Sequence, residues 1–373
     1  MTITTVGAGL GATAAMVAET NYGAVVTSPV WNFYESNTVE PKKNKTPKQS
    51  SPLAGGRMVD MLSRRVISMQ SGGIELPFEW CQANHFITLL NQLSSTYAAG
   101  TAGSQAANTG CYSAGSRLTP SGSTYAYTFT FRNSVAGRSA AWQLGVPTTD
   151  AVLRQYDLLG AKPTKYAWSC KAGDFLTCAT TWDARVLEDP LITTTYQAAP
   201  GGSTQTPYTQ ASPSYTPAVP YDFAEAMFQI GATATAASTA AAIDGVSGFD
   251  WSVENKLKVD RQYYGNGGLK DEPISNDVRP IMGTINSDFL NKAYFADAFY
   301  SDTPQSIIAT FSNGPLTATS NAIQFVFNNT VLDNNSPGAA NKDVVNTAFP
   351  LQALYDGTNE PLMIIVQTTD ATV

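Results

Sequence analysis

Residues 71–97 combine a strand pattern with a helix pattern, and this block constrains the fold more than any other part of the chain. After Gly72-Gly73, which we expect to interrupt the chain, residues 74–80 place their apolar side chains on one parity, as a half-buried strand does. Asn84 then caps a predicted helix. The apolar residues of this helix follow at helical spacing: Phe86, Leu89, Leu90, Leu93 and Tyr97. Such a stripe must cover another element, so we interpret the helix as a structural plug packed on a sheet.

Most of the remaining pattern is strand-like. Short runs alternate apolar and polar residues between turn-forming Gly, Pro, Asn and Ser. We predict further strands at residues 25–39, 62–69, 124–132, 165–171, 175–184, 222–230, 246–259, 279–285, 305–311, 321–328, 343–354 and 361–368. A second helix is expected to begin at Ser287 and to continue to Ala298. The chain is therefore predicted to be mainly β, with one or two flanking α-helices.

Three long segments lack a regular pattern. Residues 40–57 carry several prolines and lysines, and residues 98–120 and 192–220 are rich in small and polar residues. Two interpretations of 40–57 stay open: a mobile solvated loop, or an extended arm that docks on an acidic neighbouring subunit. The lysines that would make this contact are Lys42, Lys43, Lys45 and Lys48. Arg64 and Arg65, on the strand that follows, either face solvent or join a subunit contact.

The N-terminal residues 1–24 begin with a misleading motif. Residues 7–12 match G-x-G-x-x-A, the glycine pattern of a dinucleotide-binding turn. The supposed helix after it is short and Ala-rich, and no buried parallel strand follows. We therefore expect residues 1–24 to form an arm that is flexible or ordered by a partner, ahead of a β domain over 25–373.

The composition argues against several functional classes. Charged residues make up only 14% of the chain and its net charge is -7, whereas a nucleic-acid clamp needs a basic groove. No apolar run reaches the roughly 18 residues of a membrane span, and the N-terminus lacks the cationic region of a secretory signal. The four cysteines contain no CxxC pair, which favours buried thiols in a reduced, cytoplasmic setting: Cys81, Cys111, Cys170 and Cys178.

No catalytic or metal-binding motif emerges from the sequence. The single histidine, His85, lacks the companions of a zinc site and the elbow motif of a Ser-His-Asp hydrolase, so we predict a structural role for it. We predict no enzyme activity, no catalytic or metal-binding residue and no cofactor. A glycosidase whose two carboxylates meet only in the fold stays open as an alternative.

The order of these features resembles the major tail tube proteins of long-tailed, siphovirus-type bacteriophages. The resemblance spans most of the chain and includes E-T-N-Y-G at 19–23, an aromatic first strand and the long Pro/Lys segment. It continues with the Gly72-Gly73 strand, the helix ending in Leu89-Leu90 and a late β-rich half. The E-T-x-Y-G run and the Gly-Gly, strand and helix block are the most specific of these features.

The resemblance implies two packed β-sheets, as a sandwich or partly closed barrel, and a structural role in the virion. Copies are expected to form rings, usually hexamers, that stack into a helical tube for DNA ejection. Residues 40–57 stand where a stacking loop would be, which favours the docking interpretation. The expected partners are further copies, other tail proteins at the tube ends, and passing DNA that is not specifically bound, with no membrane. The expected location is the virion tail, assembled in the bacterial host cytoplasm.

Further alternatives remain at this stage. Strand followed by helix occurs at 72–97 and again at 278–300, so a duplicated tube fold, with halves about 25–190 and 221–373, would give trimeric rings. Residues 98–120 and 192–220 either decorate the tube exterior or mark such a duplication. A capsid decoration or fibre protein would share this polar β composition. A carbohydrate-binding sandwich would need an exposed platform built from Trp31, Trp142, Trp168, Trp182 and Trp251.

Overall fold

Strands dominate the chain in its computed structural model. The structure describes residues 11–51, 59–81, 84–98, 118, 124–133, 135, 137–148, 153–196, 204–215, 218–288, 295–333 and 346–369. Within these ranges every strand pairing is antiparallel. The same ranges contain three short α-helices: α1 (Asn84–Leu93), α2 (Ala234–Thr239) and α3 (Ala296–Ser301). The prediction of a mainly β fold is confirmed.

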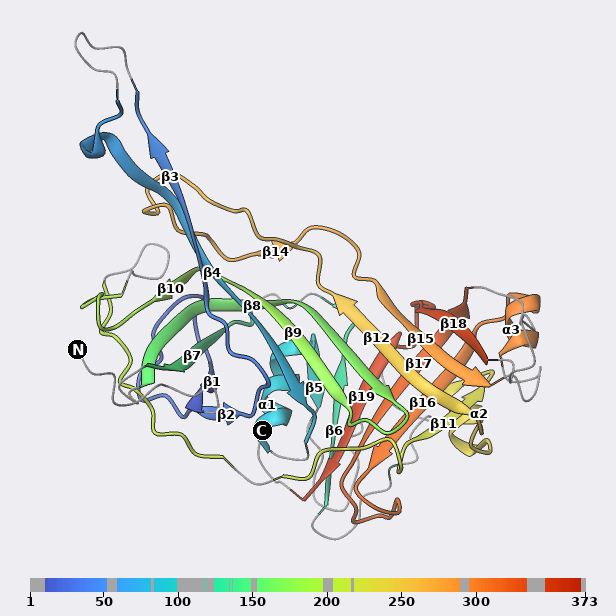
Figure 1. The fold of residues 1–373 in the computed structure, drawn as a ribbon. Coiled ribbons are helices and arrows are strands. Elements are labelled where there is room, and N and C mark those ends of the chain that lie inside the picture. Colours follow the sequence, from blue (N-terminus) through green and yellow to red (C-terminus); the bar gives the residue numbers. More distant parts are fainter. Residues whose placement is uncertain are drawn as a thin grey trace.

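Seventeen strands of the described ranges are joined by hydrogen bonds into one sheet, which folds into three runs (Figure 1). The first run forms one wall of the core. Its strands, in spatial order, are β3 (Lys42–Gln49), β4 (Arg65–Glu79), β9 (Thr177–Ala184), β8 (Leu153–Lys171), β12 (Val246–Glu254), β15 (Ile281–Asp288) and β18 (Asn346–Ala353).

The second run forms the opposite wall and joins the first where β17 pairs with the end of β18. Its strands, in spatial order, are β5 (Thr96–Ala98), β6 (Tyr125–Thr130), β19 (Leu362–Thr368), β17 (Ala322–Leu332), β16 (Gln305–Ser312) and β11 (Met227–Gly231). The third run branches from β8, and its other strands are β2 (Asn32–Tyr34), β1 (Thr13–Ala18), β7 (Ala140–Pro147) and β10 (Val186–Glu188). A separate two-stranded pair consists of β13 (Leu257–Lys258) and β14 (Ile274–Ser275).

Strand β8 connects the first and third runs because its two halves have different partners. The first half pairs with β7 and β10, and the second half pairs with β9 and β12. The register against β9 shifts after Pro163, and Gly160 has a φ of 65°, a left-handed conformation that glycine adopts without strain. One long strand therefore turns from one run into the other.

Aromatic side chains fill the space between the first two runs. Trp168 of β8 and Trp251 of β12 stack with their ring centroids 5.7 Å apart. Phe325, on β17 of the opposite wall, meets Trp168 edge-on at 5.0 Å. These rings are fully buried, and edge-to-face contacts add about 0.5–1.5 kcal/mol each beyond the burial of their area.

Helix α1 packs between the first and third runs. Phe86 lies 4.7 Å from the ring of Trp80 and 5.6 Å from that of Tyr34. The next apolar residues of the helix, Leu89, Leu90 and Leu93, have no exposed surface. Tyr97 lies beyond the end of α1, in β5, so its predicted place on the helical stripe is wrong.

Two segments predicted to lack regular structure contain strands. Residues 13–18 form β1, which pairs with β2 and β7 of the same chain, so the expectation of an arm over 1–24 that is flexible or ordered by a partner is wrong for these residues. Residues 42–49 form β3, within the segment 40–57 that we expected to be a loop. Its proline, Pro47, lies at a register shift on an edge strand, where the missing N–H disturbs no inner pairing.

Other boundaries also differ from the sequence predictions. Strand β4 continues through Gly72-Gly73 without a break. Glycine is needed at position 72 for close packing, because a Cβ there would lie 3.0 Å from the backbone of Val186 and Leu187. Ser287 lies inside β15 and does not begin a helix. Residues 289–294 of that predicted helix are outside the described residues, and α3 begins only at Ala296. The strand predicted over 25–39 is reduced to the three residues of β2.

The described part of 192–220 lies over the third run. The ring of Tyr208 meets Trp31 at 5.0 Å, and its hydroxyl accepts a hydrogen bond from Val26 N at 2.8 Å. Ala211 N donates to Oε1 of Gln143, on β7, at 2.7 Å. These residues therefore cover the outer face of that run. Nearly all of 98–120 is outside the described residues.

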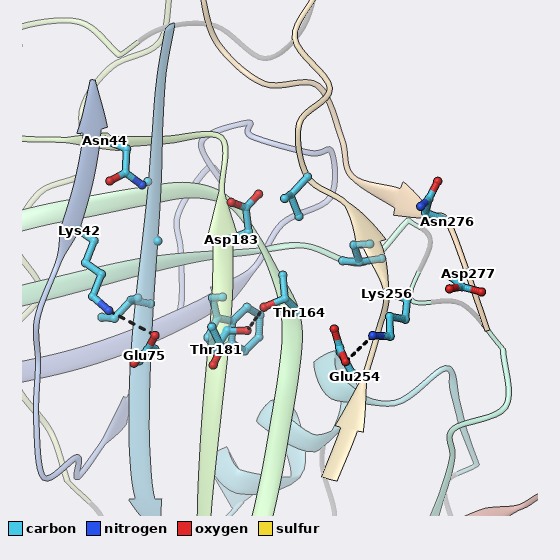
Figure 2. A pocket seen from close by; sticks show the side chains of 16 residues that line it. Lys42, Asn44, Glu75, Thr164, Thr181, Asp183, Glu254, Lys256, Asn276 and Asp277 are labelled. Carbon is cyan, nitrogen blue, oxygen red and sulfur yellow. Dashed lines mark hydrogen bonds and ion pairs between the residues drawn. The ribbon is translucent and has the colours of Figure 1, made fainter. Parts of the chain in front are cut away.

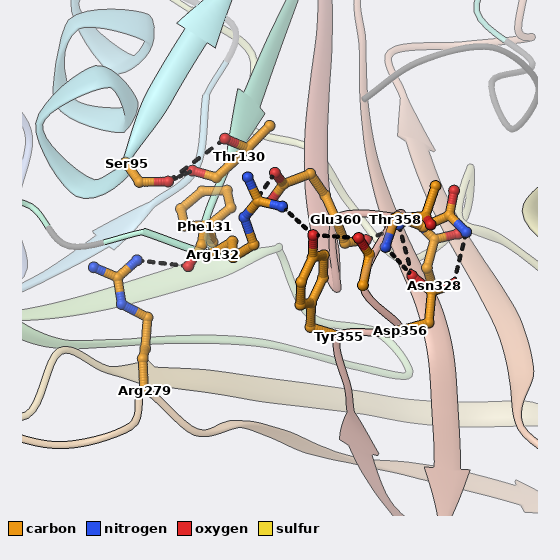
Figure 3. A network of polar contacts seen from close by, with 12 residues as sticks. Ser95, Thr130, Phe131, Arg132, Arg279, Asn328, Tyr355, Asp356, Thr358 and Glu360 are labelled. Atoms are coloured by element: carbon orange, nitrogen blue, oxygen red, sulfur yellow. Dashed lines mark hydrogen bonds and ion pairs between the residues drawn. The ribbon is translucent and has the colours of Figure 1, made fainter. Parts of the chain in front are cut away.

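A network of polar contacts links the second run of strands to the first (Figure 3). Arg132, which follows β6, lies 3.4 Å from a carboxylate oxygen of Glu360 and donates to the hydroxyl of Tyr355 at 2.6 Å. Arg279, just before β15, donates to Phe131 O at 2.7 Å. The network ties the end of β6 to the β18–β19 connection and to β15.

The burial of α1 predicts the effect of a charge in its stripe. Leu89→Asp places an unpaired carboxylate where the native side chain has no exposed surface, and we expect a loss of several kcal/mol of unfolding free energy. Thr88→Asp, one position away on a half-buried site, is the matched control, and its urea midpoint should stay close to that of the wild type. Urea unfolding followed by tryptophan fluorescence measures both, and an unchanged midpoint for Leu89→Asp contradicts this packing.

Candidate assembly interface

A two-stranded ribbon projects from the body of the molecule. Strand β3 and the first part of β4 form this β3–β4 hairpin, together with the short 3-10 helix η2 (Leu62–Arg64) (Figure 1). Every residue of β3 is exposed, whereas from Ser71 onward all residues of β4 except Glu75 are buried or half-buried. The hairpin is thus the exposed continuation of a core strand.

The six cations predicted as contact residues fall into two groups. Lys42 and Lys43, at the base, lie 3.3 Å from Glu75 and 3.7 Å from Glu188. The other four have no ion pair within the described residues and belong to the distal half of the hairpin, residues 45–49 and 62–70. These four are Lys45, Lys48, Arg64 and Arg65. The structure therefore brings the predicted cations onto one hairpin and separates paired from unpaired ones.

The distal half also exposes apolar side chains. Leu62 is 85% exposed, Val66 59% and Ile67 53%. A lone two-stranded ribbon is marginally stable in water, and an unpaired strand edge is a template for another chain. Exposed apolar residues beside unpaired cations are typical of a surface that a partner covers.

The connection between β13 and β14, residues 259–273 (the β13–β14 loop), lies against Ser68 and Gln70, where the distal half of the hairpin begins. Gly268 O accepts a hydrogen bond from Gln70 N at 3.0 Å. Gly268 has a φ of 76°, and a Cβ there would lie 2.5 Å from Ser68 O. Glycine is therefore required for this contact, both for its conformation and for its small size.

Buried charges anchor the β13–β14 loop to the body. Lys270 pairs with Asp183 of β9, and Glu272 pairs with Lys162 of β8. Arg185 donates to Lys270 O at 2.9 Å. Burial lowers the pKa of Lys162 and raises the pKa of Asp183, and in each case the paired opposite charge acts against the effect of burial. Since a buried charge that loses its partner is costly, this network holds the loop, and with it the base of the hairpin, in place.

A cleft of about 510 Å³ lies between the base of the hairpin and residues 254–277. Figure 2 shows Lys42 paired with Glu75 on one side and Lys256 paired with Glu254, at 2.7 Å, on the other. Because each cation has its own anion, the cleft presents no single sign of charge to a ligand. Within the described ranges no three His, Cys, Asp or Glu residues are grouped so that they could hold a metal ion.

The single histidine and the described cysteines have packing roles. Burial lowers the pKa of His85 to about 4, and its ring lies 4.8 Å from Phe86 and 5.1 Å from Tyr34. Burial also raises the pKa of the Cys81 thiol to about 12 and of the Cys170 thiol to about 11. These two and Cys178 are free and buried, and Cys111 lies outside the described residues. None of the helices in the described ranges is long and apolar enough to cross a membrane.

Sequence reasoning did not find the support of the hairpin. Nothing in the sequence of Asn266-Gly267-Gly268 signals that these residues contact β4. The pairs of Lys270 and Lys162 join residues 87 and 110 positions apart in the chain. Such long-range pairs leave no periodic pattern in a single sequence.

The chain matches a known family over most of its length. The model of that family, described as phage tail tube protein, matches residues 9–353. The match spans the hairpin and the β13–β14 loop and ends at the last residue of β18. No curated protein matches the chain.

Two glycines of the β13–β14 loop allow a test of the hairpin support. Gly268→Ala and Gly265→Ala both place alanine at a positive φ, which costs about 1–2 kcal/mol. Only Gly268→Ala also pushes a methyl group against Ser68 O, since no atom lies within 4 Å of a Cβ at Gly265. We expect Gly268→Ala to lose about 1–3 kcal/mol more, and its Gln70 amide to exchange hydrogen faster. Equal exchange at Gln70 in the two variants shows that the contact does not hold the hairpin.

Proposed function

The chain belongs to the phage tail tube protein family and is a structural component of the virion tail, and we propose that its copies form rings that stack through the β3–β4 hairpin. Tail tube proteins assemble with copies of themselves. The proposal adds that this chain forms hexameric rings in the tube of a siphovirus-type phage. The tube conducts DNA at ejection and meets other tail proteins at its ends.

The distal half of the hairpin carries the proposal. Within the described residues, one chain leaves the four cations without ion pairs and exposes the apolar side chains to water. A neighbouring copy, from a chain of net charge -7, supplies both carboxylates and apolar surface. A contact between different surfaces of identical subunits repeats indefinitely when it does not close on itself, which is the requirement for a stack.

The number of copies per ring depends on whether the fold is duplicated. Strand followed by helix recurs as β4 with α1 and as β15 with α3. If residues 25–190 and 221–373 are related halves, each chain contributes two units and three copies complete a ring. We favour six copies of a single unit, and the rotational symmetry of the rings separates the two cases.

A tube for DNA must not retain its cargo. The chain has more acidic than basic residues, and negative side chains facing the lumen repel phosphates. We propose that DNA passes without specific binding.

Burial of the tryptophans disfavours the carbohydrate-binding alternative. Five of the six tryptophans are buried in the core, and Trp31, the remaining one, packs on Tyr208. The tryptophans therefore provide no exposed aromatic platform for sugar rings.

Shortening the hairpin tests the stacking proposal. Replacing residues 45–70 with Asn-Gly leaves the base pairing of Asn44 with Ser71 and closes it with a two-residue turn. We expect this variant to form single rings that do not stack, because the distal contacts are gone. Negative-stain electron microscopy of the concentrated wild type and variant measures ring symmetry and tube length.

The melting temperature of the same samples is the control for folding. Tubes of wild-type length from the folded variant refute stacking through the hairpin. Monomers at every concentration of the wild type refute ring assembly by this chain.

A further inference from the structure

A groove of about 680 Å³ lies on the body beside the last part of β4. Residues 34–40 form one side of it, and Pro147 and Tyr215 contribute to the rest; we call this the acidic groove. Two hydrogen bonds fix residues 34–40 against β4: Pro77 O accepts from Ser36 Oγ at 2.9 Å and from Asn37 N at 3.3 Å. The groove therefore has a fixed position relative to β4, the strand that continues into the hairpin.

The acidic groove has one sign of charge. Glu35 and Glu40 are exposed, and neither has an ion pair within the described residues. No lysine, arginine or histidine of the described chain lines the groove. Its apolar lining includes Val39, Pro147 and Tyr215, whose ring packs on Phe33 at 5.8 Å and stays 37% exposed. This is the surface chemistry that complements a cationic segment with apolar side chains.

The distal half of the hairpin is such a segment, and it lies at the other end of the same strand. In Figure 1 the hairpin projects at the upper left, whereas β2, which leads into the groove, lies low in the view. Along β4, Arg65 in the distal half and Pro77 beside the groove are separated by about 40 Å at the rise of a strand. Because β4 is continuous between them, a chain cannot place its own distal hairpin in its own groove.

We propose that the acidic groove receives the distal half of the β3–β4 hairpin of a second copy. Lys45 and Lys48 of one copy then meet Glu35 and Glu40 of the next. Val66, which pairs with Lys48 across the hairpin and so lies on the same face, packs against Val39 and Tyr215. The inference rests on the proposed stacking of rings and names the surface that accepts the hairpin.

The contact uses two different surfaces from opposite ends of one chain. Such a head-to-tail contact is heterologous, so each added copy presents a new empty groove or a new free hairpin. The length of β4 between the two surfaces limits the axial repeat to about 40 Å. Since the contacts include exposed ion pairs, added salt should shorten the tubes.

A charge-swap experiment on the full chain tests the pairing. Glu35→Lys/Glu40→Lys reverses the charge of the groove, and Lys45→Glu/Lys48→Glu reverses the charge of the two lysines proposed to meet it, while Arg64 and Arg65 stay unchanged. We expect each double variant to form rings but to lose at least tenfold in mean tube length by electron microscopy. The quadruple variant, which carries both reversals, should recover tubes. Glu225→Lys/Asp244→Lys changes the net charge equally at two exposed acids outside the groove and should form tubes of normal length.

The outcomes separate this inference from the proposed function. A wild type that forms no tubes removes the proposed function itself. Wild-type tubes together with normal tubes from Glu35→Lys/Glu40→Lys overturn the groove alone and leave the hairpin with another acceptor. Equal losses in the groove variant and the Glu225→Lys/Asp244→Lys control also overturn it, because net charge then explains the effect. Recovery in the quadruple variant supports direct pairing.

Discussion

Strand β4 is buried along one half and exposed along the other, and much of the molecule follows from that division. Its buried half carries Ile74, Leu76 and Phe78 into the core, where α1 and the aromatic rings pack on it. Its exposed half is one strand of the hairpin. Because the backbone is continuous, the core determines the direction in which the hairpin points. A feature that looks like a loose appendage in the sequence is therefore the continuation of a core strand.

The sequence was informative wherever one side of a strand faces the core. The alternation at 74–80 predicts the buried parity of β4, and a similar pattern predicts β9. Strands β16, β17 and β19 were also predicted, although they are buried on both faces. The sequence pattern was misleading where a residue type is explained by its place in the tertiary structure. Gly72-Gly73 reads as a break but provides close packing, and Pro47 reads as a breaker but lies on an edge strand. The sheet order was out of reach, since β8 meets β12 through residues about 80 positions away.

The sequence pointed to the cationic residues of the candidate interface, but not to how these residues are arranged in the fold. Composition alone singled out the lysines of 42–48 and the arginines at 64–65. It could not tell that Lys43 reaches Glu188 on β10 while Lys48 has no ion pair among the described residues. Nor could it find the acidic groove, because Glu35 and Glu40 join Pro147 and Tyr215 only in the fold. Contacts of this kind depend on sheet pairing, which a single sequence does not encode locally.

The energetics of exposed ion pairs explain why such an interface suits a ring. One exposed pair contributes about 0.2–1 kcal/mol and weakens with salt, so two lysines cannot hold two subunits together by themselves. When several copies are fixed in one ring, however, docking the first hairpin brings the others to high effective concentration at their grooves. Weak contacts then add around the ring and stabilise the stack, while a free subunit binds poorly outside a ring. The low charge content of the chain, 14%, fits the proposed arrangement, in which charges act mainly where rings meet. In the proposed stack, apolar contact from the exposed Val66 does not weaken with salt as ion pairs do, and is a second, independent source of stability.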